Sequence, residues 1–195
     1  MTISFSNSKD LSLLLEEGFP ALFPTDTVPA LAATPKNAIN LWKLKKRPKN
    51  KPLILMGASA EQLLGFVLPI ALEDACNIGS SYWPGALTII LPAISEILAN
   101  LNPMGNSIGM RVPACTLAID LLETSGPLAT TSANLSGYDP LLDPQEVSSC
   151  FPEVPLLGPA PWPRASGLAS TLIKWESKGR WQLLRRGAVI PSEVG

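Results

Sequence analysis

The sequence has no histidine at any of its 195 positions. Imidazole is the general base in Ser-His-Asp and Cys-His catalysis and a frequent zinc ligand, so its absence excludes both kinds of nucleophilic catalysis and imidazole-dependent zinc sites. Any chemistry must therefore depend on cations, hydroxyl groups, backbone donors and the positioning of reactants.

Cysteine is scarce as well. Cys76, Cys115 and Cys150 are odd in number, far apart and without metal-ligand spacing. Three separate reduced thiols are typical of a cytoplasmic protein, where we expect them to be small buried hydrophobic residues.

Long apolar runs are also missing. The stretch 75–95 carries no charge, but Asn77, Pro84, Gly85 and Pro92 interrupt it, so we expect no transmembrane helix and no membrane partner. Residues 1–10 show no apolar core behind a basic start, and we therefore expect no secretory signal.

Charge is sparse and nearly balanced. Only 16% of the residues are charged and the net charge is −1, which gives no global reason to expect a nucleic acid or an anionic membrane as a partner. Six of the 15 basic residues nevertheless fall within 43–51, which makes this one concentrated positive segment. Neither standard phosphate-binding glycine loop, Gly-x-x-x-x-Gly-Lys-Ser/Thr or Gly-x-Gly-x-x-Gly, occurs in the sequence.

The hydrophobic content of 46% and the chain length predict one packed domain, residues 1–195. Apolar runs predict strands at 19–23, 28–33, 52–56, 87–91, 107–112 and 127–130, with a hairpin formed by 170–175 and 181–185. Helical spacing and end signals predict helices at 11–17, 35–44, 61–66, 72–78, 117–123 and 143–147. In the second of these helices we expect Ile39, Leu41, Trp42 and Leu44 to be buried. The proline-rich segment 152–169 is predicted to be a long irregular loop.

Strands and helices alternate along the chain, and two hairpin-like pairings interrupt the alternation. We therefore predict an α/β fold with a mixed, twisted sheet flanked by helices.

Two cationic positions are candidates for anion binding. Lys45-Lys46-Arg47 at a helix end suits a polyphosphate, although it equally fits a solvated face that complements the negative end of the helix. Arg111 ends an apolar strand, where an arginine indicates a waiting carboxylate or phosphate. Ser132 and Asn134 could bind a phosphate or hydrated Mg²⁺, or they could form an ordinary turn. The tetrad 24–27 could likewise be only a turn with capping hydroxyl groups.

Seven stretches in one order resemble the L-threonylcarbamoyladenylate synthase family, in the short form of its YrdC-like domain. They are FPTDTVPALAA at 23–33, KKRPKNKPL at 45–53, YWPGALTIIL at 82–91, SIGMRVP at 107–113, TTSANLSG at 130–137, STLI at 170–173 and LRRGAV at 184–189. The resemblance implies a YrdC-like mixed sheet with a concave, positively charged face.

It also implies a nucleotidyltransferase that condenses L-threonine, bicarbonate and ATP, with Mg²⁺, into threonylcarbamoyl-AMP and pyrophosphate. Partner proteins would then move the threonylcarbamoyl group onto an adenosine of tRNA, giving threonylcarbamoyladenosine (t6A). Catalysis would consist of positioning and of neutralising phosphate charge, without histidine.

The resemblance assigns roles to individual positions. Lys45 and Arg47 match catalytic residues that bind the ATP phosphates. The further nucleotide contacts that it implies are Ser107, Asn134 and Arg185. The positions that it places around threonine are Thr27, Lys51, Arg111, Ser132 and Ser170. No residue is assigned as a direct protein ligand of the metal.

The sequence departs from the family pattern at Pro29-Ala30, Ala86, Leu142 and the 158–169 loop. Two alternatives remain open from the sequence. One is a non-enzymatic paralogue that binds tRNA or double-stranded RNA through the same basic surface. The other is a related carbamoylating enzyme with a different amine acceptor, for which the Pro29-Ala30 segment is the support.

Overall fold

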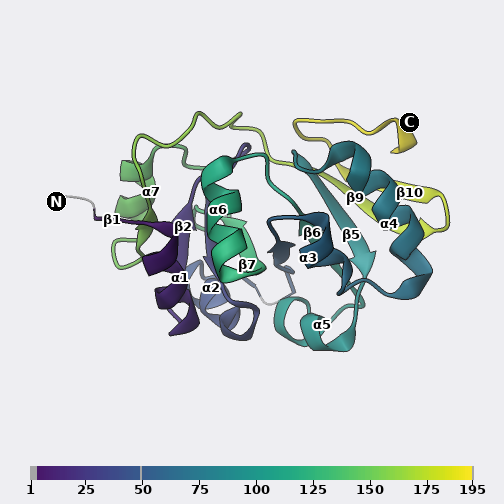
Figure 1. Ribbon diagram of the computed structural model, residues 1–195, viewed down its shortest axis with the longest axis horizontal. Coiled ribbons are helices and arrows are strands. Elements are labelled where there is room, and N and C mark those ends of the chain that lie inside the picture. Colours follow the sequence, from purple (N-terminus) through teal and green to yellow (C-terminus); the bar gives the residue numbers. More distant parts are fainter. Residues whose placement is uncertain (1–3, 49, 195) are drawn as a thin grey trace.

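The computed structural model describes residues 4–48 and 50–194, which form a mixed ten-stranded sheet flanked by helices (Figure 1). The strands lie in the order β1-β8-β2-β3-β7-β4-β6-β5-β9-β10. The predicted α/β class is therefore confirmed. Lys49 of the basic segment and residues 1–3, where the sequence predicts no secretory signal, lie outside the described residues.

The strands are β1 (Phe5–Ser6), β2 (Ala21–Phe23), β3 (Ala30–Ala33), β4 (Ile54–Met56), β5 (Leu87–Pro92), β6 (Ser107–Arg111), β7 (Leu128–Ser132), β8 (Leu156–Leu157), β9 (Thr171–Ser177) and β10 (Arg180–Arg185). The helices are α1 (Ser8–Glu16), α2 (Ile39–Leu44), α3 (Ala60–Leu64), α4 (Pro69–Tyr82), α5 (Ser95–Leu101), α6 (Thr116–Ser125) and α7 (Pro144–Cys150), with short 3-10 helices at Pro35–Asn37 and Ser192–Val194. No helix among the described residues is long and apolar enough to cross a membrane.

Both hairpin-like pairings are present. β2 pairs antiparallel with β3, and β9 pairs antiparallel with β10. Gly179 supplies the positive φ of +69° at the β9–β10 turn, a backbone conformation that glycine adopts without steric cost. The pairs β4–β6 and β5–β9 are parallel, which makes the sheet mixed.

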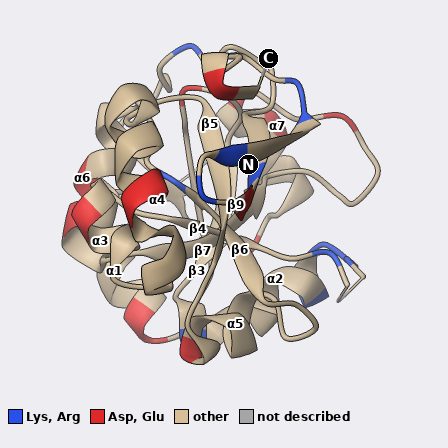
Figure 2. Ribbon diagram, turned by 90° about the vertical axis from the view of Figure 1, so that its right-hand side faces the viewer, with Lys and Arg blue, Asp and Glu red and all other residues tan. Residues whose placement is uncertain are grey.

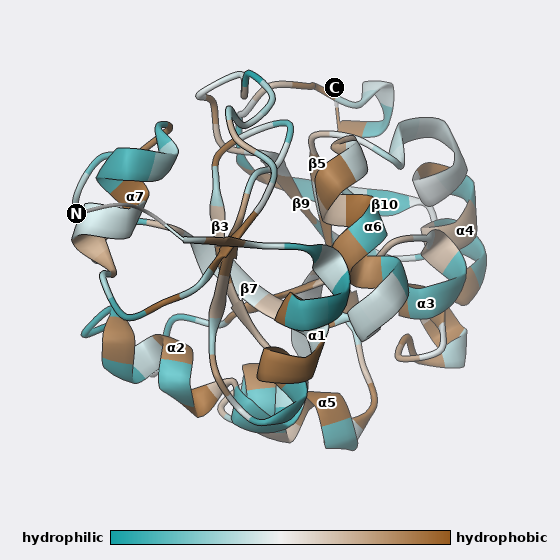
Figure 3. Cartoon of the chain, turned by 60° about the vertical axis from the view of Figure 1, so that its left-hand side comes forward, coloured by the Kyte–Doolittle hydropathy of each residue, from teal (hydrophilic) through white to brown (hydrophobic). Residues whose placement is uncertain are grey.

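One face of the sheet carries the larger hydrophobic core. Side chains opposite one another in neighbouring strands, such as Leu55, Met110, Ile89 and Ile173, point to this face and are fully buried. They pack with apolar residues of α2, α3, α4, α5 and α7. Figure 3 shows the corresponding pattern along the helices, where hydrophobic and hydrophilic segments alternate.

The second face is covered at one end by α1 and α6, which lie side by side (Figure 1). Their leucines pack on Phe23, Ala32, Met56 and Leu128 to form a smaller core. Farther along the same face, register places Ile54, Gly109, Ile90 and Lys174 in one row. Three of these four residues are half-buried. We call this row, together with the β6 residues Ser107 and Arg111 on either side of it, the site face.

Local signals explain where several helices begin. The side chains of Asn7, Ser59 and Asp143 each accept a hydrogen bond from a backbone N–H in the first turn of the helix that follows, at α1, α3 and α7. Such caps satisfy donors that would otherwise have no partner.

Some expectations were wrong in detail. Ile39 and Leu44 are exposed, because α2 is only six residues long and points Leu41 and Trp42 into the core. The 152–169 segment is not wholly irregular, since β8 pairs parallel with β1 and β2. α5 and β1 were not predicted at all.

The cysteines were expected to be buried. Cys115 is buried and Cys150 is half-buried, but Cys76 is exposed, so the expectation fails there. All three thiols are free, as predicted.

Burial differs between the neighbouring strands β9 and β10, so truncating a side chain on each should change the free energy of unfolding by different amounts. Ile173→Ala on β9 should lower the free energy of unfolding by about 2–5 kcal/mol, because it removes a fully buried side chain and leaves a cavity. Leu184→Ala on β10 is the control: Leu184 is 46% exposed, and its truncation should cost about 0.5 kcal/mol or less. Urea denaturation measures both, and equal losses would contradict the placement of the core.

Candidate functional site

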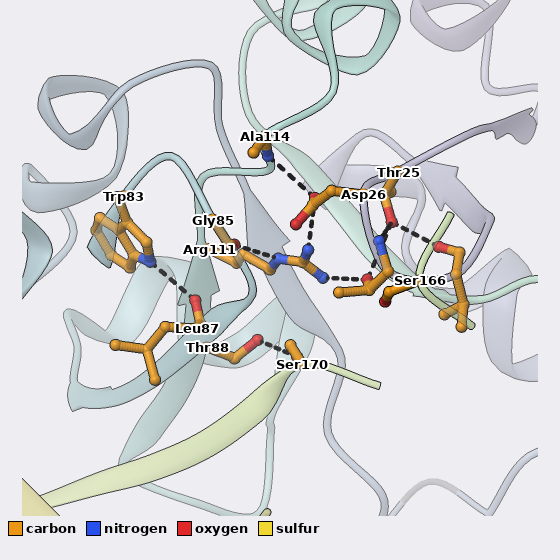
Figure 4. Close-up of polar contacts among 12 residues, drawn as sticks. Thr25, Asp26, Trp83, Gly85, Leu87, Thr88, Arg111, Ala114, Ser166 and Ser170 are labelled. Atoms are coloured by element: carbon orange, nitrogen blue, oxygen red, sulfur yellow. Dashed lines mark hydrogen bonds and ion pairs between the residues drawn. The ribbon is translucent and has the colours of Figure 1, made fainter. Parts of the chain in front are cut away.

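The Arg111 guanidinium lies at the centre of the first group of polar contacts (Figure 4). Its Nε donates to the Gly85 carbonyl at 3.0 Å, Nη1 donates to Thr27 Oγ1 at 2.6 Å and Nη2 donates to Asp26 Oδ1 at 2.7 Å. Arg111 is 4% exposed. Burial lowers the pKa of this arginine and the Asp26 carboxylate opposes the shift, so the group stays charged as half of a largely buried ion pair.

A compact loop between β2 and β3 supplies two of the three partners of Arg111, Thr27 and Asp26. Thr25 Oγ1 lies 3.0 Å from Thr27 Oγ1, donates to the Val28 carbonyl at 2.7 Å and accepts from the Thr27 N–H. The hydroxyl groups of Thr25 and Thr27 thus fix the loop from within, as in side-chain-stabilised turns. The turn expected for the tetrad 24–27 is therefore present, and it also holds Arg111.

The end of the proline-rich segment 152–169 is attached to the same place. Ser166 N–H donates to the Asp26 carbonyl at 3.0 Å, and Gly167 N–H donates to the Thr27 carbonyl at 2.9 Å. Gly167 has a φ of +75°, and a Cβ added there would approach Leu142 Cδ1. Leu142, one of the departures from the family pattern, therefore packs beside this attachment.

A second polar contact joins β5 to the start of β9. The hydroxyl groups of Thr88 and Ser170 are 2.7 Å apart and both residues are buried. Arg185 donates to the Ser170 carbonyl from Nε at 3.1 Å and from Nη2 at 2.9 Å. Because Thr88 lies one strand over from Arg111 on the same face, this cluster extends the Arg111 group.

The Lys45 ammonium forms the centre of the other group, at the end of β7. Its Nζ donates to Thr131 Oγ1 at 3.2 Å, to Ser132 Oγ at 3.3 Å, to Asn134 Oδ1 at 3.1 Å and also to the Ser132 carbonyl. Lys45 is 2% exposed. Burial, and after it the charge of Arg47, lowers the pKa of Lys45 to about 8.

Arg47 and Lys51 lie in the basic segment beyond α2, where Figure 2 shows blue segments beside that helix. Arg47 donates from Nε to the Lys51 carbonyl at 3.3 Å and from Nη2 to the Pro52 carbonyl at 3.0 Å. The guanidinium is half-buried, and burial lowers its pKa from a value so high that it stays charged. The Lys51 side chain is exposed.

Seven of the ten predicted residues fall in these two groups, while Arg47 and Lys51 lie in the basic segment and Ser107 lies at the start of β6. Thr27, Arg111, Ser170 and Arg185 belong to the first, although Arg185 was expected on the nucleotide and the other three on threonine. Lys45, Ser132 and Asn134 belong to the second, although Ser132 was expected on threonine. Ser107 begins β6 and Arg111 ends it, so these two lie at opposite ends of one strand.

Three further polar residues were not among the predicted site residues. Asp26 and Thr88 are bonded to predicted residues, as described above. Lys174 is half-buried on the site face, between Ile90 and Gln182. The signal for Lys174 was present in the sequence: the buried Thr171 and Ile173 alternate with it, which places its side chain on the opposite face from the core.

A broad hollow lies next to the first group rather than on the site face. Asp26, Leu142, Trp162, Arg164 and Ser166 contribute to its lining, with β1, α7 and the proline-rich segment around them. Asp26 and Ser166 line this hollow and also take part in the contacts around Arg111.

Comparison with known proteins agrees with the resemblance noted in the sequence. The family model for Sua5, YciO and YrdC proteins, described as "Telomere recombination", matches residues 13–187. A protein of Aliivibrio fischeri named threonylcarbamoyl-AMP synthase is 36% identical over 140 residues, which cover 69% of this chain and 76% of the relative. One of Bacillus subtilis with the same name is 40% identical over 129 residues, covering 64% of this chain but 37% of the relative, so the chain spans little more than a third of that longer protein.

Solved structures are similar as well. The crystal structure of Pyrococcus abyssi Sua5 complexed with L-threonine superposes with a TM-score of 0.84 at 30% identity, covering 92% of this chain and 54% of the other. Escherichia coli YciO superposes with a TM-score of 0.80 at 23% identity, covering 95% and 91%, and supports the fold alone.

The buried hydroxyl pair on β5 and β9 gives a test of the first group. Ser170→Ala should lower the free energy of unfolding by about 1–3 kcal/mol, because the buried Thr88 hydroxyl loses its partner. The double variant Thr88→Val/Ser170→Ala should recover part of this loss, since neither partner then remains unsatisfied. Chemical denaturation of the single and double variants measures the coupling, and strictly additive losses would contradict it.

Proposed function

The chain belongs to the Sua5/YciO/YrdC family, and from this premise we propose that it is a threonylcarbamoyl-AMP synthase that uses ATP, L-threonine and bicarbonate to make the threonylcarbamoyl donor for t6A in tRNA. The observation that carries the proposal is the pair of polar groups described above. One gathers cations and oxygen atoms around Lys45, and the other presents Arg111 with the Thr27 and Ser170 hydroxyl groups.

The second group suits the phosphates of ATP. Lys45 and Arg47 are the proposed catalytic contacts, and Asn134 and Ser107 add polar contacts on the nucleotide. Arg185 is the third cation proposed for ATP, and its exposed guanidinium can reach a ligand while its bonds to Ser170 hold it in place. A set of fixed cations neutralises charge that develops on phosphate oxygens during transfer.

The first group suits an amino acid. Arg111 keeps two of its five N–H groups for a substrate carboxylate after its three protein contacts. Thr27 and Ser170 of this group offer hydroxyl groups for the remaining polar atoms of threonine. The proposal adds the Ser132 hydroxyl from the second group and the Lys51 ammonium from the basic segment. A site that hydrogen-bonds a substrate hydroxyl rejects analogues that lack it, so these residues favour threonine over apolar amino acids.

Mg²⁺ fits the site as a companion of ATP. No group of three or more His, Cys, Asp or Glu residues among those described could hold a metal by itself. The oxygen atoms of Ser132 and Asn134 already accept hydrogen bonds from the Lys45 ammonium, so the ion would enter with ATP and be held mainly by phosphate oxygens and water. Bound there, the ion would neutralise charge on the phosphates.

The reaction needs no histidine. The threonine amine attacks bicarbonate, and loss of water gives the carbamate. A carbamate oxygen then attacks the α-phosphorus of ATP in line, and pyrophosphate leaves. The protein contributes by holding the reactants in place and by its cations, and orientation of reactants supplies about 7–11 kcal/mol in favourable cases. Partner proteins and tRNA would receive the product in the cytoplasm, the compartment that three free thiols favour.

The RNA-binding alternative has less support. Its sequence basis is the basic surface alone, and the pairing of Arg111 with Asp26 removes part of the positive charge on which non-specific binding of an RNA backbone depends. A different amine acceptor would be detected by the same assay as the synthase reaction.

Pyrophosphate release tests the proposal. We expect release from ATP only when threonine and bicarbonate are both present, measured with a coupled phosphate assay. Other amino acids serve as controls. Release without threonine would contradict the proposal, and release with another amine alone would favour the alternative carbamoylating enzyme.

Arg47→Ala should lower turnover by about tenfold or more, because the variant loses a cation on the phosphates. Its melting temperature should stay nearly unchanged, since the side chain is half-buried and bonds only to neighbouring carbonyls. Lys43→Ala, an exposed lysine in the last turn of α2, is the matched control and should keep its activity. A large fall in the melting temperature of Arg47→Ala would make Arg47 structural instead.

ATP affinity should depend on pH through Lys45. Its pKa of about 8 means that the ammonium is charged below this pH and loses its proton as the pH rises through it. Affinity should therefore be full below pH 8 and decline above it. Lys45→Arg should remove the decline, because arginine keeps its charge beyond about pH 12. Calorimetric titration with Mg-ATP measures both profiles, and parallel profiles for the two proteins would contradict this role.

A further inference from the structure

We propose that Asp26 is a positioning residue for the amino-acid substrate, which fixes the Arg111 guanidinium by geometry rather than by charge alone. The inference rests on the proposed function, in which Arg111 contacts the substrate carboxylate. Asp26 itself contacts no reacting atom in this proposal.

A single oxygen of Asp26 makes both of its side-chain contacts. Oδ1 accepts from Arg111 Nη2 at 2.7 Å and from the Ala114 N–H at 3.0 Å (Figure 4). Ala114 follows β6 by three residues, so the carboxylate joins the side chain at the end of β6 to the backbone just beyond it. Two donors converging on one oxygen define its position more narrowly than an ion pair does.

The backbone of the same residue makes a third connection. The Asp26 carbonyl accepts from Ser166 N–H, and the adjacent Thr27 carbonyl accepts from Gly167 N–H. Asp26 therefore lies where three segments far apart in sequence meet: the β2–β3 loop, the end of β6 and the end of the proline-rich loop. Displacing its side chain would loosen Arg111 and the loop around it together.

The consequence for Arg111 follows from its remaining contacts. Without Asp26, the guanidinium keeps only the Gly85 carbonyl and the Thr27 hydroxyl as protein partners. A buried guanidinium with an unmet donor turns toward water or another acceptor. Since a small misplacement of a binding group weakens binding steeply, affinity for threonine should suffer before affinity for ATP.

Two substitutions separate geometry from charge. Asp26→Asn removes the charge but keeps an oxygen that can accept both hydrogen bonds. Asp26→Glu keeps the charge but moves the carboxylate by one methylene group. Positioning predicts that Glu raises the KM for threonine by about fivefold or more while Asn stays within about threefold of the wild type, with kcat and the KM for ATP little changed in both. If Asp26 acted only by compensating the charge of Arg111, Asp26→Asn would instead raise the KM for threonine more than Asp26→Glu does.

Asp74 provides the matched control. Its Oδ2 also accepts two N–H groups, from Trp175 Nε1 at 2.7 Å and Gly179 N at 2.8 Å, and it lies on α4 in contact with the β9–β10 hairpin. Asp74→Asn and Asp74→Glu should leave both KM values unchanged. A threonine KM that rises equally in the Asp74 and Asp26 variants, or an Asp26→Asn effect larger than that of Asp26→Glu, would overturn the proposal.

Amide hydrogen exchange gives a readout that does not depend on activity. The Ala114, Ser166 and Gly167 amides should exchange faster in Asp26→Glu than in Asp26→Asn, while the Gly179 amide responds only to the Asp74 variants. Unchanged exchange at the first three amides would also overturn the proposal. If the wild type releases no pyrophosphate with threonine while these amides respond as expected, the proposed function fails and the positioning role of Asp26 on Arg111 stands.

Discussion

The ion pair between Arg111 and Asp26 is the contact on which the arrangement of the site depends. A buried guanidinium is costly unless it is paired and hydrogen-bonded, and Arg111, which is 4% exposed, donates to Gly85, Thr27 and Asp26. Gly85 lies in the loop before β5, and Thr27 and Asp26 lie in the loop between β2 and β3. Neither loop belongs to a strand that is hydrogen-bonded to β6 at these residues. Fixing one charge therefore fixes the relative position of three pieces of backbone, and a substrate can use the remaining N–H groups without reorganising the site.

The sheet makes this convergence possible. β6 lies between β4 and β5, and strand order brings β9 next to β5 although more than 75 residues separate them in the chain. One face of the sheet is occupied by the larger core, whereas α1 and α6 cover the other face only at one end. Polar side chains such as Thr88 and Lys174 can therefore occupy the site face without disturbing the core, because successive residues of a strand point to opposite sides.

The sequence predicted the elements better than their contacts. Apolar runs and helix-end signals located most strands and helices, because these signals are local. Ile39 and Leu44 were misjudged because the helix around them is too short to bury all four predicted residues, and β8 was missed because a two-residue strand has no period. Arg111 was expected to meet a carboxylate or a phosphate, and it meets the Asp26 carboxylate. The identity of this partner could not be inferred, since Asp26 lies 85 residues away and resembles any turn aspartate. Nothing in the order of the motifs indicated that Arg185 would lie with Ser170, or Ser132 with Lys45.

The charges of the two groups differ in a way that matches the two proposed substrates. Among the described residues, the ion pairs are Arg111–Asp26 and the exposed Lys178–Glu73. Lys45, Arg47 and Arg185 instead bond to carbonyl, amide or hydroxyl oxygen atoms, which orient a cation but do not cancel its charge. The end of the site near Lys45 and Arg47 therefore keeps two uncancelled cations for a polyanion such as ATP, whereas in the first group Asp26 cancels the charge of Arg111 and Arg185 alone stays unpaired. Because like charges repel strongly where water is excluded, a bound polyanion at Lys45 and Arg47 would disfavour a second polyanion beside Arg111, which is consistent with the proposed amino acid at that place.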